Sequence, residues 1–259
     1  MIEDNDAPTR GRVTEWSERS RLRMTQTLDS LDYGPMFEPG LPAAMVTLTL
    51  PGDGWEQLVP DIPTFKKMVD RLNVAHRPAW GQPLRGTWKM EFQKRGAPHL
   101  HILMVPPAGL SRGRGALKGK KYSNWLSLRW AQIVGAPEGS RMRKDHELAG
   151  VEVNFATVAR YSDPRRIGAY FAKHGSFSAK DYQNEMPQHW QEAIRAGETG
   201  GGNFWGYWGL EKAVVTVELR GSMKRASFID GEPLLHRHQQ PKFDLDGSVY
   251  GNNRHYVSR

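Results

Sequence analysis

Apolar and polar residues alternate along several short segments of this chain, whereas in other segments apolar residues recur every three or four positions. A period of two, combined with β-branched and aromatic residues, predicts strands, because successive side chains of a strand point to opposite faces. The segments with this pattern, closed by turn residues, are 44–50, 85–92, 99–105, 150–158 and 212–219.

The connection between the second and third of these strands is short. It reads "QKRGAP" and contains Gly96 and Pro98, two residues that favour turns. Strands joined so directly must run antiparallel, because a parallel pair needs a long crossover. We therefore expect residues 85–105 to form a β-hairpin.

The helical period is clearest between residues 64 and 75, where apolar side chains recur at spacings of three and four. A second helix is expected to begin at Asp163, a good N-cap residue followed by Pro164, and to end before Gly175. Residues 14–31, 124–135 and 187–197 have weaker helical patterns.

The order of these elements mixes strands and helices around an obligatory antiparallel pair. This order predicts an α+β fold with a central antiparallel sheet of about five strands, flanked by helices, and disfavours a doubly wound parallel sheet. Composition suggests three regions. They are an N-terminal helical or flexible appendage (1–40), a main domain (41–222) and a C-terminal tail (223–259).

Cysteine is absent from all 259 residues. This excludes disulfides, thiolate catalysis and cysteine-type zinc sites, so a metal would need His, Asp or Glu ligands. No apolar run approaches the roughly 18 residues of a membrane span, and the acidic N-terminus lacks the pattern of a signal peptide. We therefore expect a soluble, cytoplasmic protein that does not bind membranes.

The basic residues are unevenly distributed. The net charge is +8, yet residues 1–40 have five basic and eight acidic side chains, so the remainder has a charge of +11. Such a balance favours a polyanionic partner such as DNA, although a solvated charged surface would give the same count. Candidate DNA contacts are Arg112, Arg114, Lys118, Lys120 and Lys121 in the glycine-rich loop 111–121, together with Arg129, Arg165 and Arg166.

The segment "HLHIL" places two histidines on one face of a predicted strand. His99 and His101 point to the same side, and folding the hairpin brings Glu91 of the preceding strand beside them. Two imidazoles and one carboxylate form a facial set that leaves open positions for water or a phosphate oxygen. This set suits Mn²⁺ or Mg²⁺, and Zn²⁺ is chemically compatible. The alternative is that both histidines are merely polar positions on a half-exposed strand.

A second cluster lies in the predicted helix that contains "AYFAKHG". Tyr170, Lys173 and His174 project to one side, because residues three and four apart are neighbours on a helix. A tyrosine that attacks phosphorus needs a nearby cation to support its phenolate, and Lys173 could supply it or hold the phosphate. Alternatively, Tyr170 is a packing residue beside a solvated lysine.

In combination, the strand "TLTL", the "HLH" strand with its upstream Glu91 and the helical "YFAK" resemble the HUH endonucleases. The order of the histidine pair before the tyrosine resembles rolling-circle replication initiators of actinobacterial plasmids and phages. The resemblance covers residues 44 to about 210. It implies the HUH-endonuclease, ferredoxin-like fold, with Glu91, His99 and His101 as metal ligands.

The resemblance also implies a reaction. Tyr170 would attack a phosphate of a single-stranded or hairpin origin, leaving a 5′-phosphotyrosine and a 3′-OH, with Lys173 as the motif lysine. Some initiators have a second tyrosine four residues on, where this chain has His174. Termination would then use a second protomer of a homodimer, an activated water or Tyr182, with Tyr161 a weaker candidate. No Walker motif is present, so a host helicase and DNA polymerase are expected partners.

Rival interpretations share parts of this evidence. A transposase of the HUH type or a mobilisation relaxase would use the same chemistry, although the order of motifs argues against a relaxase. A non-catalytic DNA-binding module would need a lost ligand or nucleophile, and every one of them is in the sequence. A metal phosphoesterase acting on nucleotides would not need Tyr170.

Overall fold

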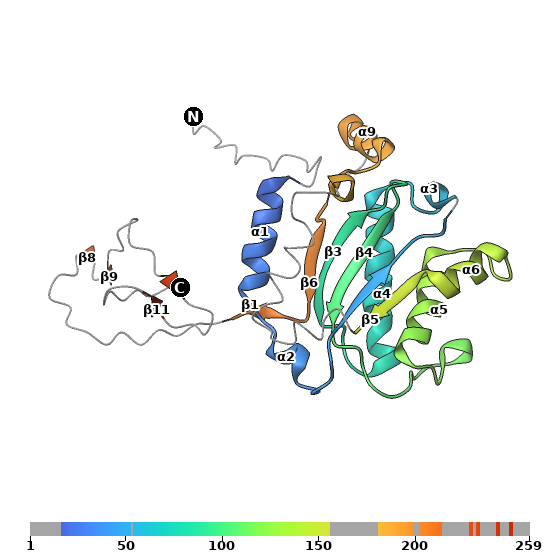
Figure 1. Ribbon diagram of the computed structural model, residues 1–259, viewed down its shortest axis with the longest axis horizontal. Coiled ribbons are helices and arrows are strands. Elements are labelled where there is room, and N and C mark those ends of the chain that lie inside the picture. The colour runs from blue at the N-terminus through green and yellow to red at the C-terminus, as the bar shows by residue number, and fades with distance from the viewer. Residues whose placement is uncertain are drawn as a thin grey trace, which may run out of the picture. The chain divides into compact units, whose positions relative to one another are not determined.

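The structure is a computed structural model that describes residues 17–52, 54–155, 181–198 and 202–213, and four short strands between residues 228 and 250. Contacts divide the chain into two compact units, residues 1–211 and 212–259. The first unit contains the central sheet and the helices around it (Figure 1). The domain boundaries expected at residues 40 and 222 remain predictions.

The central sheet has five strands in the order β5-β2-β4-β3-β6, and every neighbouring pair is antiparallel. The fold prediction of an α+β domain around an antiparallel sheet is therefore confirmed. Two expected strands form the hairpin, in which Gly96 takes the positive φ of 80° that the tight turn requires. The five strands are β2 (Ala44–Leu48), β3 (Gly86–Phe92), β4 (Pro98–Met104), β5 (Val151–Asn154) and β6 (Trp205–Trp208).

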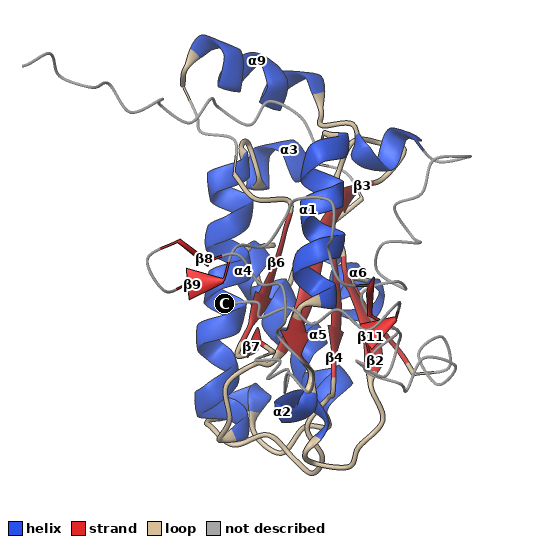
Figure 2. Cartoon of the chain, turned by 90° about the vertical axis from the view of Figure 1, so that its left-hand side faces the viewer, coloured by secondary structure: helices blue, strands red, loops and turns tan. Residues whose placement is uncertain are grey.

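The longest helix, α4 (Ile62–Trp80), begins and ends as its sequence dictates. The Asp61 carboxylate accepts a hydrogen bond from the backbone N–H of Thr64 at 2.7 Å, and Gly81 ends the helix with a φ of 77°. Its apolar stripe is buried, and Phe65 packs edge-to-face on Trp130 of α5 (Tyr122–Val134). Figures 1 and 2 show α4 and α5 on one side of the sheet and α1 (Glu18–Asp29) on the other.

Alternation divides the sheet residues into two sets. Val46, Leu100 and Ile102 are fully buried in the hydrophobic core on one face. Their neighbours along the strands, including Thr47 and His101, point to the opposite face. The apolar set fixes the register, since a slip of one residue would exchange the two faces.

The remaining elements are short, apart from α6 and α9. Among the helices of the described residues, none combines the length and the apolar character that crossing a bilayer requires. Their bounds are α2 (Gly34–Phe37), α3 (Trp55–Leu58), α6 (Arg141–Ala149), α9 (Gln188–Ala196), the 3₁₀ turns Gly115–Leu117 and Asp181–Asn184, and the paired strands β1 (Leu31–Asp32) with β7 (Glu211–Lys212), β8 (Phe228–Ile229) with β9 (Glu232–Pro233), and β10 (Lys242–Phe243) with β11 (Val249–Tyr250).

The fifth strand of the sheet differs from the expectation. It is β6 at Trp205–Trp208, whereas the sequence pattern indicated residues 212–219, most of which lie outside the described residues. The expected helix from Asp163 to Gly175 also lies outside them. The helix α6 was not expected at all.

Candidate metal centre

The hairpin of β3 and β4 brings the three predicted ligands together on one face. Glu91 is the direct cross-strand partner of His99, and His101 lies between Lys89 of β3 and Thr47 of β2. Directly opposed side chains of antiparallel strands have Cβ atoms about 4.5–5.5 Å apart, which brings their tips into contact. The grouping expected from the sequence is therefore present.

The distances show that both imidazoles converge on one carboxylate oxygen. Nε2 of His101 lies 3.0 Å from Oε2 of Glu91, and Nε2 of His99 lies 3.6 Å from the same oxygen. The two rings are 4.5 Å apart between centroids. One potential ligand atom from each of the three residues lies within 4.8 Å of the others.

Burial and charge set the protonation states at this centre. Burial alone would raise the pKa of the Glu91 carboxyl, but the interactions with His101 and His99 and the charge of Lys89 outweigh it. The pKa of Glu91 therefore lies well below its ordinary value, and the group is a carboxylate. Burial also lowers the pKa of His99, more than the nearby carboxylate raises it. A neutral imidazole is the form that can bind a metal.

Lys89 is a member of this centre that sequence reasoning missed. Its side chain is 2% exposed, and its ammonium forms an ion pair with Oε1 of Glu91. This contact occupies one carboxylate oxygen and leaves Oε2 facing the two histidines. The signal was available, since Lys89 precedes Glu91 by two positions and so shares its face.

Thr47 supports His101 from the neighbouring strand. Its Oγ1 lies 3.2 Å from Nδ1 of His101, so the hydroxyl can accept the Nδ1–H while Nε2 faces Glu91. The sequence had left two interpretations of Thr47 open, a place on the floor of the site or ordinary sheet packing. The contact with His101 places it at the site.

These residues fit a divalent cation. The donor set is one carboxylate oxygen and two imidazole nitrogens, a combination that suits several divalent ions. Nε2 of His99 is buried and has no hydrogen-bond partner within the described part of the chain, which is an unusual state for a buried polar atom. A cation bound there would satisfy this nitrogen. The three residues do not select one ion over another.

The basic loop lies at the other end of the sheet. It follows β4, and from His99 to Met104 the strand runs five residues, or roughly 16 Å at about 3.3 Å per residue. Figure 1 shows the loop between β4 and α5 at the lower end of the sheet. Its predicted DNA contacts are exposed except Lys120, which is half-buried; they are Arg112, Arg114, Lys118, Lys120 and Lys121.

The loop itself is closed by hydrogen bonds around one buried serine. Oγ of Ser111 donates to the carbonyl of Leu117 at 2.6 Å and accepts from the backbone N–H of Lys120 at 2.9 Å. Arg129, another predicted DNA contact, is half-buried in α5, with Nη1 3.3 Å from Oε1 of Gln132. The structure therefore does not bring these residues to the metal centre.

The predicted nucleophile is not among the residues that the structure describes. Tyr170, Lys173, Arg165 and Arg166 all lie within 156–180, which falls outside them. The segment follows β5 directly. Tyr182, the alternative nucleophile, is half-buried in the 3₁₀ turn Asp181–Asn184.

Comparison with protein families gives one match. The model of the family described as replication-associated protein ORF2 matches residues 43–176, just over half of the chain, and this range includes Glu91, His99, His101 and Tyr170. No curated protein and no solved structure is significantly similar to the chain. The match confirms the resemblance to replication initiators that the motifs indicated. The chain belongs to the replication-associated protein ORF2 family.

Proposed function

We propose that this chain is a divalent-cation-dependent enzyme that nicks and joins single-stranded DNA at a specific site, and thereby initiates rolling-circle replication. The observation that carries the proposal is the convergence of Glu91, His99 and His101 within 4.8 Å, in a chain of a replication-associated family. A protein that only bound DNA would not need this set of ligands.

Glu91, His99 and His101 would hold the cation, with Mn²⁺ or Mg²⁺ the expected ion and Zn²⁺ compatible. A bound divalent ion would supply Lewis-acid polarisation of the scissile phosphate. Thr47 orients His101, and Lys89 keeps Glu91 ionised and turned toward the histidines. These contacts exist among the protein's own residues, so the ligands are held in place by the sheet.

Tyr170 is the proposed nucleophile. Its phenolic oxygen forms a bond to phosphorus and the bond from phosphorus to the 3′ oxygen breaks, so the phenol loses a proton and the 3′ oxygen gains one. The products are a 5′-phosphotyrosyl link and a free 3′-OH that can prime synthesis. Lys173, one turn further along the expected helix, would neutralise charge on the phenolate or the phosphate.

The DNA substrate is expected to be a single strand or a hairpin at the replication origin. Arg112, Arg114, Lys118, Lys120 and Lys121 are proposed phosphate contacts, with Arg129, Arg165 and Arg166 as further candidates. A host helicase and polymerase would continue replication. With one tyrosine on the helix, a second protomer or Tyr182 would complete the closing strand transfer.

Tyr170→Phe tests the nucleophile. With a single strand from the cognate origin and Mn²⁺, the wild-type protein should give a DNA adduct that survives denaturant, and the variant should give none. Because phenylalanine lacks only the hydroxyl, binding of the strand should persist. The matched control is Tyr182→Phe, which should keep the adduct.

The outcomes separate the alternatives. An adduct of undiminished yield in Tyr170→Phe would move the nucleophile to another residue. Cleavage without any adduct, in wild-type protein, would favour a metal phosphoesterase that uses water. Binding without cleavage by the wild-type protein, with Mn²⁺ or Mg²⁺ present, would favour a non-catalytic DNA-binding module.

A further inference from the structure

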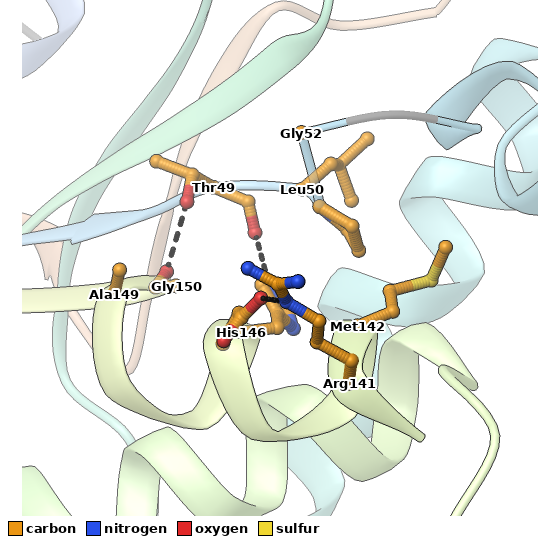
Figure 3. Close-up of a pocket in the computed structure, with 10 residues that line it drawn as sticks. Thr49, Leu50, Gly52, Arg141, Met142, His146, Ala149 and Gly150 are labelled. Carbon is orange, nitrogen blue, oxygen red and sulfur yellow. Dashed lines mark hydrogen bonds and ion pairs between the residues drawn. The ribbon is translucent and has the colours of Figure 1, made fainter.

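A pocket of about 580 Å³ opens where β2 ends, on the edge of the sheet next to β5. One wall is the segment 49–52 that follows β2, and the other wall is α6 (Figure 3). Its volume lies within the roughly 300–1,000 Å³ range of small-ligand sites. None of the three proposed metal ligands lines it, so it is a separate site.

Hydrogen bonds fix the two walls to each other. The backbone N–H of Thr49 donates to the carbonyl of Gly150 at 2.9 Å, and its Oγ1 donates to the same carbonyl at 3.2 Å. The carbonyl of Thr49 in turn accepts from Nε2 of His146 at 2.8 Å. Figure 3 shows Thr49 between these two partners. The pocket is therefore preformed, which lowers the entropic cost of binding.

Arg95 connects this pocket to the metal centre. It lies in the β3–β4 turn, between Glu91 and His99, and its guanidinium donates to the carbonyls of Leu50, Pro51 and Gly52 at 3.0, 2.8 and 2.7 Å. In addition, Thr47, which contacts His101, precedes Thr49 by two residues, or about 7 Å of extended chain. A group held in the pocket would thus keep a fixed position relative to the cation site.

The polar groups of the pocket suit a nucleotide. His146 is 4% exposed, and because its Nε2–H donates to Thr49, its Nδ1 is an acceptor; this atom has no hydrogen-bond partner among the described residues. Arg141 and Asp145 stand at the rim, 94% and 65% exposed in their side chains. Acceptors that can take a base N–H and an arginine that can meet a phosphate are the groups that unpaired DNA requires.

We propose that this pocket binds one unpaired nucleotide of the DNA strand, next to the phosphate that is positioned at the metal centre. The proposal rests on the proposed function, because DNA is inferred there. The base enters between the two walls and the strand continues across the polar face of the sheet toward His101.

Two substitutions fill the pocket from opposite walls. At Gly52 an added Cβ meets no atom within 4 Å and the backbone is not left-handed, so Gly52→Trp introduces a large side chain without a clash in the fold. Ala149→Trp does the same from exposed α6 surface. The matched control is Leu148→Trp, at a neighbouring position that is 83% exposed and does not line the pocket.

The probe is a single-stranded oligothymidylate that contains one photoreactive 5-iodouracil. It is used with chelator present and on the Tyr170→Phe background, so that the result depends on neither cation nor nucleophile. Crosslinked peptides from the wild-type walls should fall within residues 49–52 or 141–150. Both filled variants should lose these crosslinks and bind the strand about tenfold more weakly, as expected for one lost base contact, whereas Leu148→Trp should keep both.

Crosslinks that map only outside these segments, or affinities of the filled variants within about twofold of the control while circular dichroism shows them folded, would overturn the pocket assignment. Loss of the crosslinks on adding one equivalent of thymidine monophosphate would also overturn it, because the site would then prefer a free nucleotide. Neither result bears on adduct formation by Tyr170, which is measured separately with Mn²⁺ and unmodified DNA.

Discussion

The two faces of the central sheet are built from the same strands, yet they contain opposite kinds of residue. Leu100 is fully buried in the core on one face, while its neighbours His99 and His101 meet Glu91 on the other. A strand reverses its face at each residue, so one segment can fix the fold and present ligands at once. Stability and cation binding should therefore respond to substitutions at alternate positions.

The largest effect is expected on the apolar face. Leu100→Ala removes a side chain with no exposed surface and should lower the free energy of unfolding by about 2–5 kcal/mol. Urea unfolding followed by tryptophan fluorescence measures this. If the two faces are independent, the folded fraction should still bind Mn²⁺ with wild-type affinity; a large loss of affinity would show that they are coupled.

The converse experiment is His101→Ala. It removes one of three proposed ligands, so Mn²⁺ affinity should fall by about 100-fold, at the upper limit of what changes in supporting residues cost. Isothermal titration calorimetry with Mn²⁺ provides the readout, with His189→Ala as the control because His189 stacks on Trp55 away from the centre. Wild-type affinity in the His101 variant would remove it from the ligand set.

A smaller effect should follow Thr47→Val. Valine keeps the β-branched shape but cannot accept the hydrogen bond of Nδ1 of His101, now 3.2 Å from Oγ1. We expect Mn²⁺ affinity to fall by about tenfold, since the imidazole loses its orienting partner. The melting temperature should barely change. An unchanged affinity would mean that Thr47 only packs in the sheet.

The smallest effect concerns a histidine of the helical layer. His76 is buried in α4, and burial lowers its pKa, although its contact with the carbonyl of Gln82 opposes this. Below its ordinary pKa of about 6.5 the unfolded chain takes up a proton that the folded protein does not, so stability falls as the pH falls.

The slope from this one group is at most about 1.4 kcal/mol per pH unit. Urea midpoints at about pH 7.5 and 5.5 should therefore differ less in His76→Gln than in the wild-type protein. Some slope should persist, because burial also lowers the pKa of His146. Equal slopes in the two proteins would show that His76 titrates normally when folded.

The hairpin and its ligands could be predicted because their signals are local. Alternation places His99 and His101 on one face, and a short turn requires Glu91 to return beside them. Lys89 was missed despite the same alternation, because lysine is almost never fully buried unless it is paired, and the pairing appears only once the strands are assembled.

Other features depend on tertiary structure. In β6 the pattern "WGYW" does not alternate in polarity, and its Gly206 is explained by a ring of Trp88 that would lie 2.8 Å from an added Cβ. In α6 only His146 is buried, so no apolar period marks the helix. The distance between the basic loop and the metal centre follows from strand direction, which composition does not reveal.

The ion pair between Lys89 and Glu91 has a consequence for the order of assembly. With an ammonium already balancing the carboxylate, the sheet can close around these side chains before any metal arrives. Loading and folding then become separate events, unlike in small zinc domains whose chains stay unfolded without their ion. A chelator should accordingly stop nicking while leaving the melting temperature within about 2 °C of its original value, and added Mn²⁺ should restore the reaction without a refolding step.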